Sequence, residues 1–144
     1  MLIFKTSNNI IVTNKKLEAI CMSWYVEAIK KFGTFSGRAR RKEYWMFFLV
    51  NVVIEIVIGI ISGILGSISM DLVIVGTIIT GLYGLFIFVP ALACVVRRLH
   101  DVNKSGAWIF ISLVPIVGAI WLLVLLCTEG TRGANNFGED PKAN

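Results

Sequence analysis

Three long apolar blocks constrain the fold of this chain more than any other feature of its sequence. They cover about residues 44–65, 72–96 and 107–127. As a helix rising ~1.5 Å per residue, the first block extends about 33 Å, enough to cross a hydrocarbon core of about 30 Å. In lipid, only helices and closed barrels satisfy their own backbone hydrogen bonds. The pattern therefore predicts an all-α integral membrane protein with three transmembrane helices.

The composition and the two chain ends agree with this class. Hydrophobic residues make up 56% of the chain and charged residues 16%, whereas soluble domains carry about a quarter charged residues. Residues 1–21 contain only short apolar runs, unlike a secretory signal, and we expect a poorly ordered extension there, with Met1 and Met22 as alternative start residues. Residues 128–144 form a polar tail.

Residues 22–43 combine an amphipathic helix with a basic motif. At 100° per residue, the sequence SWYVEAIKKF places aromatic and aliphatic side chains on one helical face, and Ser23, Glu27, Lys30 and Lys31 on the other. Such a helix is suited to lie in the membrane interface. The alternative is a helix packed on protein. The expected apolar face consists of Trp24, Tyr25, Ala28, Ile29 and Phe32.

Basic residues border the first two apolar blocks on one side only. The intervening loop GSISMD contains no lysine or arginine. The positive-inside rule therefore places the N-terminus and the segment after the second span in the cytoplasm, and three spans then put the C-terminus in the periplasm. We expect these cations to bind anionic lipid or a protein partner, rather than nucleic acid, because they adjoin membrane spans. They are Arg38, Arg40, Arg41, Lys42, Arg97 and Arg98.

The third apolar block allows a second topology. Pro115 and Gly118 interrupt it. Proline lacks the backbone N–H that a continuous helix needs at that position. A break there would convert the block into a re-entrant hairpin and return the tail to the cytoplasm.

Small and polar residues follow one face of each of the first two predicted spans. Glycines at these positions allow close approach of helices, so we expect the two faces to meet. Glu55 is costly in the membrane interior and should face protein or water. It is interpreted either as a proton or cation site, or as a neutral acid bonded to Asn51 or to a neighbouring helix. The packing glycines are Gly59, Gly63, Gly76, Gly81 and Gly84.

The only histidine, His100, lies in the sequence RRLHD beside Asp101. Neighbouring residues on a helix point about 100° apart, so these two do not form a catalytic base with its orienting acid. We expect a structural role, with Arg97 and Arg98 on headgroups and Asp101 capping the helix or pairing with them. Ser105 and Gly106 are expected to turn the chain into the third span.

Three separated motifs resemble the domain-of-unknown-function 805 (DUF 805) family of small bacterial inner-membrane proteins. The resemblance extends from Met22 to Pro141, with departures at Ala107, Asn136 and Glu139. It implies a bacterial inner-membrane location and leaves the biochemical role unassigned. The motif residues are Phe35, Gly37, Arg38, Arg41, Glu43, Tyr44 and Trp45; then Arg97, Arg98, His100, Asp101, Ser105, Gly106 and Trp108; and finally Gly130, Gly133, Asn135, Phe137, Gly138, Asp140 and Pro141.

These features predict a non-enzymatic membrane module that binds anionic lipid headgroups or a protein partner through its arginine clusters. The alternative is a small oligomeric transporter or channel that uses Glu55. An enzyme centred on His100 ranks third. Cys21, Cys94 and Cys127 form no CxxC pair, and a single histidine cannot complete a common metal site, so no metal or cofactor is expected. A homo-oligomer is a further possible assembly.

Overall fold

The computed structural model describes residues 22–143, which are helical apart from loops and one isolated bridge between Asn135 and Gly138. The helices are residues 22–30, α2 (Arg41–Gly66), α3 (Met70–Asp101), the 3-10 helix η1 (Gly106–Leu113) and α4 (Val117–Cys127). The expected extension over residues 1–21 and the choice of start residue lie outside the described residues.

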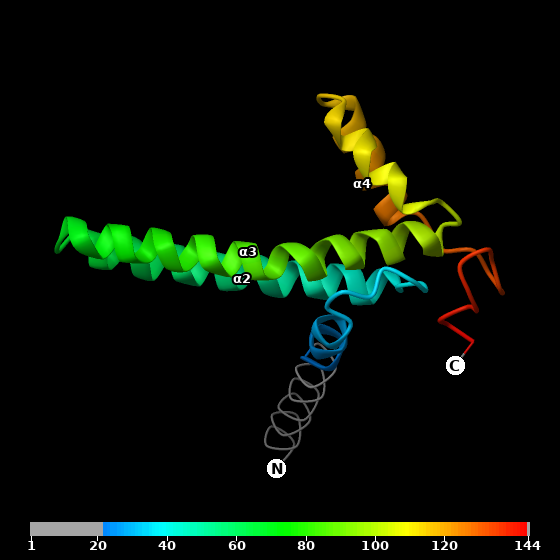
Figure 1. The fold of residues 1–144 in the computed structure, drawn as a ribbon, viewed down its shortest axis with the longest axis horizontal. Helices are drawn as coiled ribbons and strands as arrows, with labels where there is room; N and C mark the ends of the chain where they lie inside the picture. Colours follow the sequence, from blue (N-terminus) through cyan, green and yellow to red (C-terminus); the bar gives the residue numbers. More distant parts are fainter. Residues whose placement is uncertain (1–21, 144) are drawn as a thin grey trace, which may run out of the picture.

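Helices α2 and α3 run side by side over most of their length (Figure 1). Each is long and apolar enough to cross a membrane. Only 6% of the most apolar stretch of α2 and 11% of that of α3 are buried, whereas the core helix of a soluble protein would be mostly buried. The pair therefore has the surface of helices that lipid surrounds. The first two apolar blocks, residues 44–65 and 72–96, lie within these helices.

The two helices are joined by a short turn and held by a few close contacts. Ser69 caps α3, since its hydroxyl oxygen accepts a hydrogen bond of 3.2 Å from the backbone N–H of Asp71. Further along the pair, the Tyr83 hydroxyl donates to the side-chain oxygen of Asn51 at 2.6 Å, and the Asn51 amide donates to the Phe47 carbonyl at 2.7 Å. This polar link joins α3 to α2 inside an apolar region.

The helix over residues 22–30 packs on α2 and α3 with part of its apolar face. Ala28 is fully buried in a small core with Phe47, Ile87 and Cys94. The Tyr25 ring stacks on that of Phe47 at 5.7 Å between centroids. We expected this face to lie on lipid, and the structure places much of it on protein instead. The physical reason is that α2 and α3 offer a large apolar surface immediately beside it.

The third apolar block is not a single helix, so the predicted third span over residues 107–127 is wrong in this respect. It folds into a hairpin in which η1 and α4 lie against each other (Figure 1). Pro115 lies in the turn, and Ile116 has a φ of 64°, a backbone conformation that helices exclude. Gly118 permits the close pairing, because a Cβ there would lie 1.7 Å from the Ile111 carbonyl oxygen.

The hairpin begins after the C-terminal end of α3, and its second arm brings the tail back to that same end. The backbone N–H of Thr131 donates to the Asp101 carbonyl at 2.8 Å, and the Asn135 side chain donates to the His100 carbonyl at 2.9 Å. Residues 97–101 and the tail therefore lie at the same end of the α2–α3 pair. The tail therefore does not lie at the opposite end of the helix pair from residues 97–101, as three crossing helices would require, and the break expected at Pro115 and Gly118 is present.

Only one of the five glycines expected to pack α2 against α3 does so. A Cβ at Gly76 would lie 2.5 Å from the Ser62 hydroxyl oxygen, and Gly66 lies comparably close to Val73. By contrast, a Cβ at Gly59, Gly63, Gly81 or Gly84 would meet no described atom within 4 Å. The two helices therefore approach closely at Gly76 and Gly66, and the other four glycines expected at the contact leave open space beside them.

A leucine scan of α3 tests this packing. Gly76→Leu should destabilise the folded protein by about 1–3 kcal/mol, because the new side chain overlaps Ser62 on α2. Gly81→Leu is the matched control and should leave the melting temperature in mild detergent unchanged or slightly higher, since leucine favours helix more than glycine does. Equal losses in both variants would show that the second site is also packed.

A buried ion-pair cluster as candidate functional site

Five charged side chains are buried together where α2 begins and α3 ends. We call them the ionic cluster. Their residues are 0–8% exposed. We expected Arg38, Arg97 and Arg98 on lipid headgroups, and the structure instead places them inside the protein, because acidic partners distant in the sequence converge on them. The cluster consists of Arg38, Glu43, Arg97, Arg98 and Asp101.

Asp101 is the centre of the cluster. One of its carboxylate oxygens accepts a hydrogen bond of 3.0 Å from Arg38 Nε, and the other accepts one from Arg98 Nη1. The expected pairing of Asp101 with a neighbouring arginine is therefore present for Arg98. The backbone of Gly130 covers the carboxylate so closely that a Cβ there would lie 2.0 Å from Oδ2. A side chain at position 130 would therefore force the carboxylate to move.

Arg38 joins the loop before α2 to the tail. Its guanidinium donates to the carbonyls of Thr131 at 2.5 Å and Gly133 at 2.7 Å. Gly37, with a φ of 84°, turns the chain immediately before it, and a residue with a side chain would be strained there. These bonds satisfy the buried guanidinium with one carboxylate and several backbone oxygens.

The last turn of α4 ends on two guanidinium groups. Arg98 donates from Nε to the Leu126 carbonyl at 3.1 Å and from Nη2 to the Thr128 carbonyl. Arg41 donates to the Cys127 carbonyl at 3.2 Å. Carbonyls at a helix C-terminus have no partner within the helix and carry partial negative charge. The arginines therefore fix the returning arm of the hairpin to α2 and α3.

A second ion pair lies beside the first. Arg97 Nη1 donates to Glu43 Oε1 at 2.8 Å, and Lys31 Nζ is 4.0 Å from the same oxygen. Arg97 Nη2 is buried with no hydrogen-bond partner among the described atoms. The pair connects α2 to α3, and Lys31 brings in the segment that follows the first helix.

His100 holds the tail by its ring rather than by a bond to Asp101. The imidazole stacks on Phe137 with 4.0 Å between centroids and 4° between planes. Its Nδ1 lies 3.1 Å from the Gly37 carbonyl. Arg38 and Arg98 occupy the Asp101 oxygens. The geometry therefore gives His100 a packing role.

The remaining predicted cations lie at the surface. Lys42 is exposed, and the Arg40 guanidinium lies over the Trp24 ring at 5.6 Å from its centroid. Lys104 makes a comparable contact with Trp108 at 5.2 Å. Such pairs of a cation and an aromatic ring suit the depth of lipid headgroups. Sequence analysis did not assign Lys104 to the candidate lipid-binding residues.

The other motif residues support this end of the molecule. Tyr44 and Trp45 are half-buried and pack edge to face at 5.3 Å between centroids. Ser105 precedes η1, and Gly106 approaches α3 so closely that a Cβ would lie 2.8 Å from Val96 Cγ1. These two residues do turn the chain, although into the hairpin rather than into a span.

Glu55 lies apart from the ionic cluster. It is exposed on the middle of α2, at the rim of a hollow of about 280 Å³ that Phe48, Asn51 and Ile87 help to line. The expected hydrogen bond to Asn51 is absent from the described chain, because Asn51 bonds to Tyr83 and Phe47. The carboxyl group of Glu55 therefore has no hydrogen-bond partner among the described residues of a single chain.

Sequence reasoning missed the role of the tail. Asp140 accepts hydrogen bonds from the backbone N–H groups of Lys142 and Gly133, and these bonds lower the pKa of its carboxyl. The Asn135 amide also donates to the Thr131 hydroxyl at 2.8 Å. The available signal was the concentration of glycine and asparagine in GTRGANNFGEDP, which is typical of an ordered turn.

Removing the charge of Asp101 tests the cluster. Asp101→Asn keeps the side-chain shape but leaves two buried guanidinium groups without their shared carboxylate. It should lower the free energy of unfolding by about 3–5 kcal/mol, as loss of one partner of a buried ion pair does. Thermal unfolding in mild detergent measures this. Asp71→Asn, at the exposed start of the same helix, is the control, and similar losses in both variants would contradict a special role for Asp101.

Comparisons with known proteins place this architecture in a family. The family described as "Protein of unknown function (DUF805)" matches residues 32–139. Inner membrane protein YhaI of Escherichia coli K12 is 48% identical over 84% of this chain and 97% of its own. Inner membrane protein YhaH of the same strain is 43% identical over 84% and 98%. The uncharacterized protein YiiR is 27% identical over 74% and 85%.

No solved structure matches the chain. The matched range contains α2, α3, the hairpin, the whole ionic cluster and most of the tail. The chain therefore belongs to the DUF805 family of proteins of unknown function, and its relatives are bacterial inner-membrane proteins.

Proposed function

We propose that this protein is a non-enzymatic membrane module that binds anionic lipid at the cytoplasmic face of the inner membrane. In this proposal α2 and α3 cross the bilayer, and the ionic cluster holds together a platform at their cytoplasmic end. The observation that carries the proposal is the position of Arg40 over Trp24 and of Lys104 over Trp108 at this end. Cations beside interfacial tryptophans suit contact with lipid phosphates.

The charge distribution supports this orientation. The loop between α2 and α3 contains no lysine or arginine, and its nearest charge is Asp71. The opposite end carries the cations of the motif before α2 and those after α3. The positive-inside rule then assigns the cationic end to the cytoplasm. Because the tail is bonded to this end, the tail is cytoplasmic too, which replaces the periplasmic position expected from three spans.

The six predicted lipid-binding cations fall into two groups, those buried in the ionic cluster and those at the surface. Arg38, Arg97 and Arg98 are satisfied mainly inside the protein, so they shape the platform. Arg40, Lys42 and the neighbouring Lys104 lie where they can reach headgroups, and the side chain of Arg41 is 42% exposed although it bonds the end of α4. Each accessible cation contributes on the order of 1 kcal/mol at an anionic leaflet.

A reporter at the end of the tail tests the orientation. A fluorescent protein that folds only in the cytoplasm should be active when fused after Asn144, because the chain crosses the membrane an even number of times. A phosphatase active only in the periplasm should be inactive there and active when fused to a chain cut after Ser69. Phosphatase activity after Asn144 would overturn the cytoplasmic tail.

Lipid preference tests the binding role. Brominated anionic and zwitterionic phospholipids can be compared by how strongly each quenches tryptophan fluorescence in reconstituted protein. Arg40→Gln together with Lys42→Gln should reduce the preference for anionic lipid by up to about fivefold per cation, the equivalent of about 1 kcal/mol each. High salt should produce a similar reduction, because the attraction is screened.

The control keeps the charges and exchanges the side chains. Arg40→Lys with Lys42→Arg should retain the lipid preference, because a phosphate attracts either cation. A preference that is unchanged in the glutamine variant, or lost in the charge-keeping variant, contradicts the proposal.

Transport through Glu55 is the second candidate function. It is favoured by the exposed position of this carboxyl group on the middle of α2, without a hydrogen-bond partner in the described chain. An acid at that depth is expected to face protein or water. Proton or ion flux into vesicles containing the protein, abolished by Glu55→Gln with folding intact, would favour this candidate over the lipid-binding module.

A further inference from the structure

We infer that the hairpin of η1 and α4 is a membrane-insertion surface that enters one leaflet only, on the side of the tail, with acyl chains as its partner. This inference does not depend on which side of the membrane holds the tail, nor on the preference of the exposed cations for anionic lipid. It rests on the surface of the hairpin, its backbone, its length and the positions of its two ends.

The surface of the hairpin is apolar on all sides. Residues 106–127 contain no charged side chain. At the tip, Leu113 is 76% exposed and Ile116 is 77% exposed, and Phe110 and Ile120 are exposed along the two arms. The hydroxyl of Ser112 is satisfied by the Ile109 carbonyl at 2.7 Å. An uncovered surface of this kind is unfavourable in water and favourable among hydrocarbon chains.

The tip carries its own hydrogen bonds. An unpaired backbone group costs several kcal/mol in hydrocarbon, so irregular backbone there needs internal partners. Pro115 has no N–H, and the N–H groups of Val114 and Val117 donate to the carbonyls of Ile111 at 3.0 Å and Pro115 at 2.7 Å. The N–H of Gly118 donates to the Val114 carbonyl at 3.0 Å. These three N–H groups are thus bonded inside the hairpin, as contact with acyl chains requires, and among the described residues the N–H of Ile116 is the one at the turn without a backbone partner.

The length of the hairpin matches half a bilayer. The 11 residues of α4 extend about 16 Å, and the 8 residues of η1 extend a similar ~16 Å. A hydrocarbon core of about 30 Å gives each leaflet roughly half that depth. The hairpin is therefore long enough to enter one leaflet, and because it is inclined to the α2–α3 pair (Figure 1) it cannot reach the opposite headgroups.

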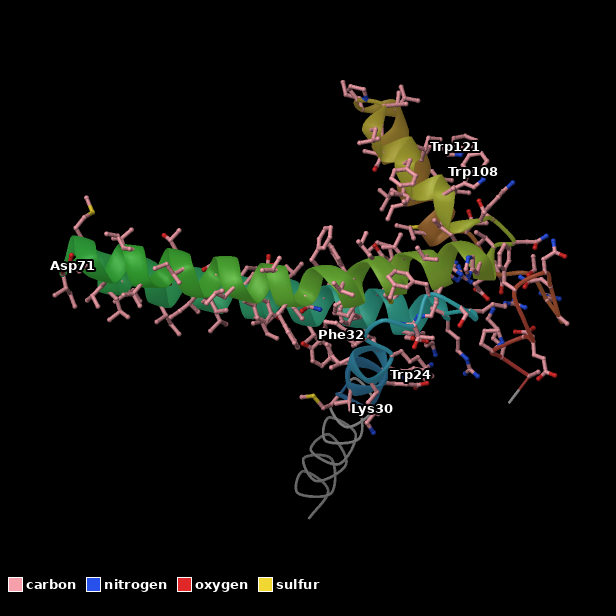
Figure 2. All side chains as sticks on the ribbon, in the orientation of Figure 1. Trp24, Lys30, Phe32, Asp71, Trp108 and Trp121 are labelled. Atoms are coloured by element: carbon pink, nitrogen blue, oxygen red, sulfur yellow. The ribbon has the colours of Figure 1, made fainter. Side chains whose placement is uncertain are left out.

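Both ends of the hairpin are fixed at the same end of α3. The first arm begins where Gly106 meets Val96, and the second ends where the Leu126 carbonyl accepts from Arg98. Figure 1 shows that the hairpin projects to one side of the α2–α3 pair, with its tip leaning toward the turn between them. Trp108 and Trp121 project from the same side of the hairpin (Figure 2). Trp108 also contacts Lys104, which suits the headgroup boundary.

Lipid fits this surface better than a second copy of the chain does. Helices that associate within membranes bring small or hydrogen-bonding residues to their interface. Here the close approach of Gly118 to Ile111 is used inside the hairpin, and large aliphatic and aromatic side chains face outward. Such a surface offers acyl chains extensive contact and offers a partner helix no close approach.

Single cysteines in the full-length protein test the insertion. In a chain whose native cysteines are replaced by serine, Ser105→Cys and Glu129→Cys mark the two ends of the hairpin, and Ile68→Cys marks the turn between α2 and α3. In sealed vesicles, a membrane-impermeant maleimide should label the first two from one face and the third from the other. Ile116→Cys, at the tip, should not be labelled from either face.

A spin label at Ile116→Cys provides a second measurement. It should collide more often with dissolved oxygen than with a water-soluble nickel chelate, as a site near the bilayer centre does. Leu113→Cys is a second tip position and should give the same result. Maleimide labelling of the tip from the face that labels Ile68→Cys would show a full crossing, and labelling from the tail side would show a hairpin outside the lipid. Spin–spin coupling between copies would show a second chain as the partner. Each of these three results overturns the inference.

Discussion

The carboxylate of Asp101 holds together three parts of the chain that are distant in sequence. It bonds Arg38 before α2 and Arg98 on α3, and it lies against the tail at Gly130. A buried charge is costly unless it is paired and hydrogen-bonded. Three arginines share two carboxylates in the ionic cluster, so backbone carbonyls of the tail and of the end of α4 must supply the remaining acceptors. The tail therefore helps to stabilise the buried charges, because its carbonyls accept hydrogen bonds from the arginines.

This requirement also determines how the third apolar block folds. If residues 107–127 formed a single crossing helix, the carbonyls of Leu126 and Thr128 would lie a membrane thickness away from Arg98. The bonds between them can form only if the chain reverses. Pro115 and Gly118 allow the reversal, and the guanidinium groups stabilise its end by satisfying carbonyls that a helix C-terminus leaves unpaired. Local sequence thus permits the hairpin, and the hydrogen bonds from the ionic cluster stabilise it over a single crossing helix.

The parts of the fold that depend on local pattern could be predicted from the sequence. Two apolar blocks separated by a short loop without lysine or arginine predicted α2 and α3, because each block is long enough to cross a membrane as a helix. Pro115 indicated a break in the third block, but the block is also long enough to cross the membrane as a single helix, so the sequence allowed both interpretations. The cluster could not be predicted in the same way, since Arg38 and Asp101 are 63 residues apart and Arg97 and Glu43 are 54 apart. Locally, each arginine looks like a headgroup ligand.

The glycine-rich faces of α2 and α3 could be predicted from the sequence, but the contacts between them could not. Gly76 meets Ser62, whereas Gly81 on the same face of α3 meets nothing within 4 Å. A small residue permits close approach but does not cause it, so periodicity identified candidates without identifying the contact. The first helix, the ionic cluster and the tail converge on the cationic end of the pair, whereas the other end is a short turn capped by Ser69, beside which Gly66 lies close to Val73. With the hairpin inserted beside the cationic end, the protein would occupy more area in that leaflet than in the other. A lipid environment that favours a wider inclusion on one side would then favour this fold.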